Sequence, residues 1–186
     1  LFMDLKNQNT EAIKGCEAKN IVTADPHALN TLKNEYGEDM VPVSHISELA
    51  LHEVKEGRIK LKAVEDTSKV YTYHDPCYLG RGNGEYESPR ELIKRLGVNL
   101  VEMKRSKNRA LCCGAGGAQM FKEPEKGDMD VNVLRTKDAL ETKPNIIATG
   151  CPYCNTMMTD GVKFHEKEEQ VEVKDIAELI AEAEKL

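Results

Sequence analysis

Five of the six cysteines in this chain form one pattern that could bind a metal. Cys77 is followed by the adjacent pair Cys112 and Cys113 and then by Cys151 and Cys154, which gives the spacing C-x34-C-C-x37-C-x2-C. Four thiolates complete a tetrahedral zinc site or hold a cubane iron–sulfur cluster. Because there are five here, the pattern indicates either a cluster opened beyond a cube or four ligands plus one sulfur kept for chemistry. Both interpretations point to redox function.

The elements that must position these sulfurs alternate between β-rich and helical patterns, which is typical of an α/β protein with a largely parallel sheet. We expect strands over residues 20–23, 70–74, 100–103, 145–149 and 170–173. We expect helices over residues 26–36, 46–56, 89–96, 130–141, 152–164 and 175–185. Cys77 and Cys151 then each follow a strand, and the Cys112–Cys113 pair lies in a loop beyond another. Since parallel strands end on one edge of a sheet, all five thiolates are expected to converge there.

Several residues beside the cysteines are candidates for supporting roles. Gly114, the first glycine after the cysteine pair, would let backbone approach the sulfurs and direct amide hydrogens at them. Pro152 makes Cys151 the head of a helix, whose dipole favours a thiolate. His74 and Asp75 precede Cys77 and are candidates for hydrogen bonding to the site or for proton delivery. Capping of the turn at the strand end is the alternative role for both.

The chain also contains an internal repeat. Residues 21–32 match residues 147–158, and residues 41–49 match residues 171–179 at nearly the same offset. We therefore expect residues 1–66 to be the latter part of a first repeat, and residues 67–186 to be a complete repeat that carries the cysteines. The first repeat has Asp25 where the second has Cys151, and Ala28 where it has Cys154.

The remaining candidates in the first repeat favour structural roles. Asp25 followed by Pro26 predicts a helix N-cap. His27 and His45 are interpreted as structural rather than as metal ligands. Cys16, in a partly apolar helical stretch, is expected to be buried as a small hydrophobic residue.

Composition limits the functional class. The formal net charge of −6 argues against a nucleic-acid partner. The longest apolar runs are only a few residues, too short to span a bilayer. Cysteines in C-C and C-x-x-C units fit metal binding in a reducing compartment, so a cytoplasmic location is expected.

Two other functions use the same residues. Four of the cysteines could hold zinc in a structural or interaction module. Cys151 and Cys154, in C-P-Y-C between a strand and a helix, could form a thiol–disulfide oxidoreductase site like that of glutaredoxins, although no proline follows Pro152. The glycine runs at residues 80–84 and 114–117 match no nucleotide-binding loop and are interpreted as turns.

Three motifs resemble the cysteine-rich CCG-domain family, which includes the B and D subunits of heterodisulfide reductase and the iron–sulfur subunit of glycolate oxidase. They are H-D-P-C-Y-L-G-R at residues 74–81, C-C-G-A-G-G at 112–117 and G-C-P-Y-C at 150–154. The resemblance implies two Rossmann-like parallel-sheet repeats, the first incomplete here. It also implies a 4Fe–4S cluster, which can be non-cubane, held by Cys77, Cys112, Cys113, Cys151 and Cys154.

The resemblance further implies a function and partners. The chain would be an iron–sulfur electron-transfer module of a larger oxidoreductase, relaying electrons to or from a disulfide, a quinone or a flavoprotein. Its partners would be iron–sulfur or flavoprotein subunits and a membrane-bound quinone partner, which would place it at the inner face of the membrane. Asp25 and Ala28 depart from the two-cluster pattern, so one cluster is expected.

Overall fold

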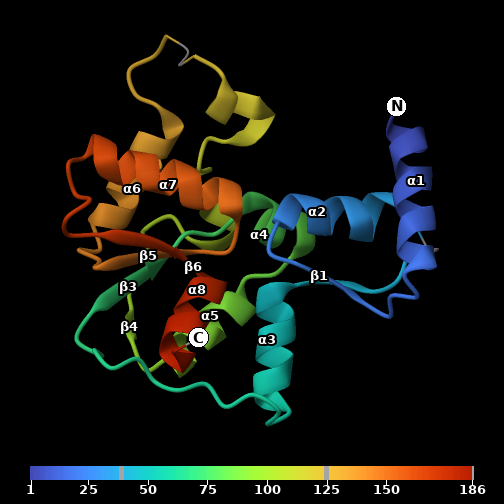
Figure 1. Cartoon of the computed structure of the whole chain (residues 1–186). Coiled ribbons are helices and arrows are strands. Elements are labelled where there is room, and N and C mark those ends of the chain that lie inside the picture. Colours follow the sequence, from blue (N-terminus) through green and yellow to red (C-terminus); the bar gives the residue numbers. More distant parts are fainter. Residues whose placement is uncertain (38–39, 124–125, 186) are drawn as a thin grey trace.

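The computed structural model describes residues 1–37, 40–123 and 126–185, and within them the expected α/β architecture is confirmed. Every strand pairing is parallel, and the strands form one four-stranded sheet in the order β4-β3-β5-β6 and a separate pair, β1-β2. Figure 1 shows the larger sheet between two helical layers, whereas β1 and the helices α1 and α2 extend to one side. Leu186, the last residue of the second expected repeat, lies outside the described residues.

The elements have the following bounds. The strands are β1 (Ile21–Thr23), β2 (Val43–His45), β3 (Val70–Tyr73), β4 (Asn99–Leu100), β5 (Ile146–Thr149) and β6 (Glu172–Asp175). The helices are α1 (Phe2–Gly15), α2 (Pro26–Asn30), α3 (Ile46–Lys55), α4 (Cys77–Asn83), α5 (Glu87–Arg95), α6 (Val131–Leu140), α7 (Pro152–Phe164) and α8 (Ile176–Glu184). A π-helical turn (Thr31–Glu35) extends α2, and 3-10 turns cover Lys107–Arg109 and Gly116–Phe121.

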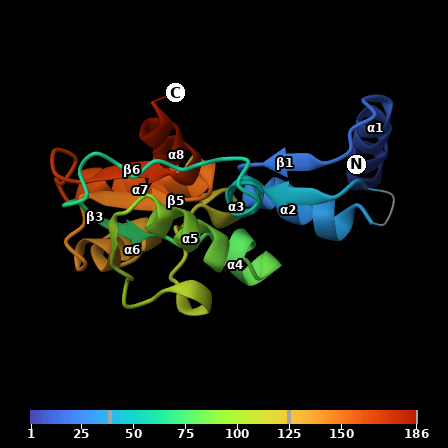
Figure 2. The same ribbon diagram turned by 90° about the horizontal axis from the view of Figure 1, so that it is seen from below.

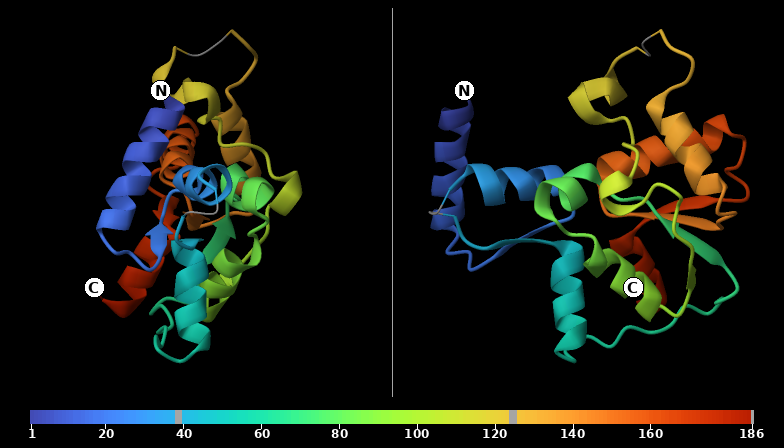
Figure 3. Two further views of the ribbon diagram at one scale, coloured as in Figure 1. Left: turned by 90° about the vertical axis from the view of Figure 1, so that its right-hand side faces the viewer. Right: turned by 180° about the vertical axis from the view of Figure 1, so that it is seen from behind.

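Each face of the four-stranded sheet buries its own apolar core. Helices α6 and α7 cover one face, with a core of Met103, Ala139, Ile147, Met158, Val162 and Val171. Helices α5 and α8 cover the other, where Tyr71, Tyr73, Ile146 and Ala148 of the sheet meet Leu92, Ile93, Leu96, Ile176 and Leu179. Helix α3 of the first repeat also packs on this second face and inserts Leu51, which is 6% exposed. Figure 3 (right) shows α3 beside α5.

The segments matched by the internal repeat have the same order of elements. The series β1-α2-β2-α3 corresponds to β5-α7-β6-α8, and in each series the two strands are adjacent and parallel. Both copies also begin their last helix with a capping box, His45 with Glu48 in the first and Asp175 with Glu178 in the second. Figure 2 shows the first series set apart from the larger sheet, with α3 crossing to it.

Several local expectations were wrong. Cys16 is exposed rather than buried, because α1 has no buried residue. The glycine run at residues 80–84 is not a simple turn, since Gly80 and Gly82 lie within α4. A Cβ at Gly80 would overlap the Tyr86 ring, so glycine there allows α4 to pack against that side chain. Helices α1 and α4 and strand β2 were not expected, and α5 begins at Glu87, two residues before Pro89.

His45 caps α3 as a neutral, fully buried side chain. Its Nδ1 accepts a hydrogen bond from the Ser47 backbone N–H at 3.3 Å, and its Nε2 lies 3.4 Å from the Ala24 carbonyl oxygen. Burial lowers the pKa of His45 below its ordinary value, 6.5. The structural role expected for this histidine is therefore confirmed.

This buried neutral histidine makes stability sensitive to acid. Because the pKa is lower in the folded than in the unfolded chain, the unfolded chain binds more protons below about pH 6.5. Stability is therefore complete above that pH and falls as the pH drops, by up to about 1.4 kcal/mol per pH unit for one proton. We expect His45→Asn, which keeps an N-cap oxygen, to flatten this dependence between pH 7 and 5 in urea titrations. An unchanged slope would assign the acid sensitivity elsewhere.

Candidate metal centre

The structure brings all five cysteines of the pattern together at the carboxyl edge of the four-stranded sheet. Cys77 follows β3 as the first residue of α4, and Cys151 follows β5 as the N-cap of α7, with Cys154 in the first turn. Strands β3 and β5 are adjacent, but the chain leaves β3 toward β4 on the opposite side. The thiols therefore lie at the topological switch point, where open α/β sheets place their ligands.

The Cys112–Cys113 pair reaches this point from a loop between two 3-10 turns, as expected. The five thiols form a chain of hydrogen-bonded neighbours in the order Cys77, Cys112, Cys113, Cys154 and Cys151. Gly114 has a φ of +91°, and its amide donates to Cys112 Sγ at 3.3 Å. A Cβ at Gly114 would lie 3.3 Å from Asn132 N and from Val131 Cβ. Glycine is thus required for this turn and directs an amide at the sulfur.

Negative charge concentrates on two of the thiols. Hydrogen bonds from Cys113 and Cys77 lower the pKa of Cys112, and a hydrogen bond from Cys154 lowers that of Cys151. The donors change in the opposite direction: the hydrogen bond to Cys112 raises the pKa of Cys113 to about 11 and also raises that of Cys77. Cys112 and Cys151 are therefore the first to become thiolates, the form that binds metal.

His74 is a buried hydrogen-bond donor directed at this cluster of sulfurs. Its Nδ1 accepts from Nε of Arg135 at 2.9 Å, which leaves the proton of the neutral ring on Nε2. Burial lowers the pKa of His74 to about 3, and the Arg135 cation acts in the same direction. A ring nitrogen of His74 and the sulfurs of Cys113 and Cys154 lie within 4.8 Å of one another.

Asp75, the other candidate of the H-D-P-C motif, has a different place. Its two carboxylate oxygens accept from the guanidinium of Arg90 at 2.7 and 2.9 Å, and one also accepts from the backbone N–H of Lys107 at 2.7 Å. Arg90 is 2% exposed and also pairs with Glu102 at 2.6 Å. Asp75 therefore fixes the loop that leads to Cys112 rather than facing the thiols.

The surroundings of the thiols fit a metal or an iron–sulfur cluster. Cys113, Cys151 and Cys154 are buried, and Cys77 and Cys112 are half-buried. Buried polar atoms near these strand ends find no hydrogen-bond partner within the described residues: Tyr73 Oη, His74 Nε2, Thr149 Oγ1 and Arg135 Nη2. Each such atom normally costs about 1–3 kcal/mol. Buried donors beside five sulfurs are what a negatively charged cluster would require.

Arg135 was not identified from the sequence. Its side chain is fully buried, and besides His74 it binds the Arg105 carbonyl oxygen at 2.7 Å and lies 3.5 Å from Asp138. It comes from α6, 61 positions after His74, and no local motif marks it. Only the packing of α6 beside the switch point brings this cation to the site.

Comparison with protein families identifies this arrangement. Residues 71–159, which contain all five cysteines, match the model of the cysteine-rich domain called CCG. This chain carries a domain of the CCG family.

Curated relatives that contain this CCG domain are redox proteins by name. The chain is 45% identical to the probable iron-sulfur-binding oxidoreductase FadF of Bacillus subtilis, over 98% of this chain and 26% of that protein. It is 39% identical to the EtfAB:quinone oxidoreductase of Syntrophomonas wolfei, over 98% and 26%. It is 35% identical to one of the subunits of the dihydromethanophenazine:CoB–CoM heterodisulfide reductase of Methanosarcina acetivorans, over 97% and 44%. The chain thus spans a quarter to less than half of these relatives.

The first repeat contributes to the surface around the CCG cysteines. Pro26 and His27, at the start of α2, line the same small pocket as the five cysteines. Leu29 of α2 packs against Leu79 of α4, and both are fully buried. Asp25 is the N-cap of α2, as predicted, and accepts from the backbone N–H of His27 at 2.9 Å. Gly150 keeps Cys151 close to this repeat, since a Cβ there would lie 3.3 Å from the His45 ring.

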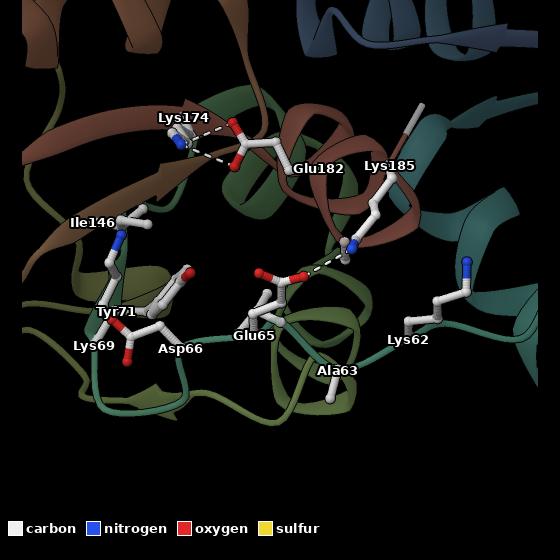
Figure 4. Close-up of a pocket in the computed structure, with 12 residues that line it drawn as sticks. Lys62, Ala63, Glu65, Asp66, Lys69, Tyr71, Ile146, Lys174, Glu182 and Lys185 are labelled. Atoms are coloured by element: carbon white, nitrogen blue, oxygen red, sulfur yellow. Dashed lines mark hydrogen bonds and ion pairs between the residues drawn. The ribbon is translucent and has the colours of Figure 1, made fainter.

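The largest cavity among the described residues lies elsewhere. It has a volume of about 660 Å³ and lies between the 62–69 segment, the sheet and α8 (Figure 4). Lys174 and Lys185, which line it, are paired with Glu182 and Glu65 at 2.8 Å, and Lys62 is paired with Glu184 at 3.0 Å. Because these charges neutralise one another, the cavity presents no anion or cation site. Among the described helices, none is long and apolar enough to cross a membrane.

Proposed function

We propose that this chain is an iron–sulfur electron-transfer module of a larger oxidoreductase. Cys77, Cys112, Cys113, Cys151 and Cys154 would hold one 4Fe–4S cluster, non-cubane because five thiols rather than four meet at the site. The observation that carries the proposal is this convergence at the switch point, beside buried donors with no protein partner among the described residues. The cluster would supply one-electron redox chemistry. The names of the relatives support the same class of function.

The protein's own residues would prepare the site for that charge. Gly114 N–H and His74 Nε2–H donate toward the sulfurs, and the buried Arg135 guanidinium offsets their negative charge. Burial of Cys151 and Cys154, at 1% and 2% exposed, counts against a thiol–disulfide exchange site, which requires access to a substrate. Residues 67–186 would form the complete cysteine-bearing repeat and residues 1–66 the partial one.

We propose redox subunits or domains as the partners, with iron–sulfur or flavoprotein cofactors, and a disulfide, quinone or flavoprotein as the far end of the electron path. A membrane-bound quinone partner would place the chain at the cytoplasmic face of the membrane. Iron, sulfide and zinc analysis of anaerobically purified protein tests the proposal. We expect about four iron and four sulfide per chain, from the cluster type proposed. Stoichiometric zinc without sulfide would replace the proposal by a structural zinc module.

The hydrogen bond from His74 leads to a prediction about the reduction potential. Removing a donor to the cluster sulfurs favours the oxidised state, so we expect His74→Leu to lower the midpoint potential. The shift should be on the order of 60 mV, because a hydrogen bond to a charged group is worth about 1.5–3 kcal/mol and 59 mV corresponds to about 1.4 kcal/mol for one electron. His74→Gln, which keeps an N–H donor, should shift the potential less.

The measurement is a redox titration followed by electron paramagnetic resonance. His52→Gln is the matched control, since His52 is exposed on α3. Equal potentials for His74→Leu and His74→Gln would show that the His74 N–H is not the group that acts on the cluster.

A further inference from the structure

The imidazole of His27 stands beside the cysteine cluster although it belongs to the repeat that has lost its own cysteines. A ring nitrogen of His27, a carboxylate oxygen of Asp25 and Cys151 Sγ all lie within 4.8 Å of one another. One metal–nitrogen bond and one metal–sulfur bond together span about 4.4 Å. His27 and Cys151 are therefore within reach of one metal ion after a small adjustment.

The ring of His27 is held in place from two sides. Its centroid lies 4.6 Å from that of Tyr78 and 4.9 Å from that of Tyr153. Tyr78 follows Cys77, and Tyr153 lies between Cys151 and Cys154. The imidazole is thus positioned between the two segments that carry three of the five thiols.

Asp25 determines which nitrogen of His27 faces the centre. Its Oδ1 accepts from the backbone N–H of His27 at 2.9 Å and lies 2.9 Å from Nδ1 of the same residue. In the neutral ring Nδ1 therefore carries the proton and Nε2 has the free lone pair. Within the described residues Nε2 has no hydrogen-bond partner. A histidine whose second nitrogen is bound to a carboxylate is the usual arrangement of a metal ligand.

The two histidines at the centre thus have opposite tautomers. Arg135 donates to His74 and makes its Nε2 a donor, whereas Asp25 accepts from His27 and makes its Nε2 an acceptor. The first is suited to hydrogen-bond a sulfur and the second to bind a metal ion.

We propose that His27 is a nitrogen ligand of the metal centre, oriented by Asp25. The inference rests on the proposed function, because it concerns the same centre. It gives the first repeat a role: having lost its cysteines, it supplies one non-thiolate ligand to the second. Replacement of thiolate by histidine raises the potential of iron–sulfur centres, so this ligand would raise the potential of the cluster.

The test is pulsed electron paramagnetic resonance on the cluster-loaded full chain, with natural-abundance and with ¹⁵N-histidine-labelled protein. We expect a strong histidine-nitrogen coupling in the wild type that changes with the label. It should disappear in His27→Phe, which keeps an aromatic ring between Tyr78 and Tyr153 but has no nitrogen. It should remain in His74→Leu and in the exposed control His52→Gln. His27→Cys should also have a lower midpoint potential than the wild type.

The outcomes separate the two proposals. An iron–sulfur cluster with no strong histidine coupling, or with a coupling that persists in His27→Phe, overturns the assignment of His27 and leaves the electron-transfer function standing. A chain that binds zinc and contains no sulfide overturns both. Iron content, measured on every variant, shows whether a lost coupling reflects a lost ligand or a lost cluster.

Discussion

Serine in place of Cys113 is expected to remove most of the iron from the protein. Cys113 is 4% exposed and is the middle sulfur of the five, hydrogen-bonded to Cys112 and Cys154. A serine hydroxyl does not ionise near neutral pH, so the substitution removes a ligand rather than weakening one. We expect the affinity to fall by more than the roughly 10- to 100-fold that the loss of an outer-sphere partner costs.

The same change at each of the other four positions distinguishes an opened cluster from a closed four-ligand site. A cluster that uses all five thiols should lose iron or change its paramagnetic spectrum at Cys77, Cys112, Cys151 and Cys154 as well. A four-ligand site should tolerate serine at one of the five with its metal content unchanged. Cys16→Ser is the matched control, because Cys16 is exposed and lies outside the site. A silent position among the five would leave that thiol free to act on a substrate.

The cysteine positions could be predicted because the signals that place them are local. Pro152 after Cys151 defines the start of α7, and the predicted bounds of that helix agree with the structure. The β-rich segments before Cys77 and Cys151 are short buried strands whose ends must meet on one edge of a parallel sheet. Convergence of the thiols then follows from topology alone.

Local signals were insufficient for α1 and α4. Helix α1 buries none of its residues, so it lacks the apolar face by which a helix is recognised in a sequence. Helix α4 contains Gly80 and Gly82, which oppose helix formation unless packing requires small residues. At Gly80 packing does require one, because the Tyr86 ring occupies the position of a Cβ. That constraint comes from a contact that the sequence pattern does not display.

The roles of His27 and Arg135 depend on contacts between distant parts of the chain. His27 follows an ordinary N-cap and proline, and its sequence context indicates only a helix start. The packing of Leu29 against Leu79 is what brings this helix to the cysteines. For Arg135, burial of a guanidinium is so rare without a partner that only the structure could locate it. Sequence analysis therefore finds the thiols, whereas the groups that tune them require the fold.

A fragment of residues 67–186 is expected to be much less stable than the full chain, although it contains all five cysteines. Removal of residues 1–66 takes away α3, whose Leu51, Ala50 and Val54 pack against the core formed with α5 and α8. Truncation of one such leucine typically costs about 2–5 kcal/mol, which is a large part of the 5–15 kcal/mol available to a domain. The loss of α2 would also uncover Leu79, two residues after Cys77.

The measurement is urea unfolding of three chains, followed by iron analysis. We expect the full chain to be the most stable, a fragment of residues 46–186, which keeps α3, to be intermediate, and residues 67–186 to be the least stable and to retain the least iron. Leu51→Ala in the full chain should lower the free energy of unfolding by about 2–5 kcal/mol. If residues 67–186 proved as stable as the full chain, the second repeat would be an independent domain and α3 a dispensable cover. The expected order instead makes the first repeat part of the core that holds the sheet and, through α2, part of the metal centre.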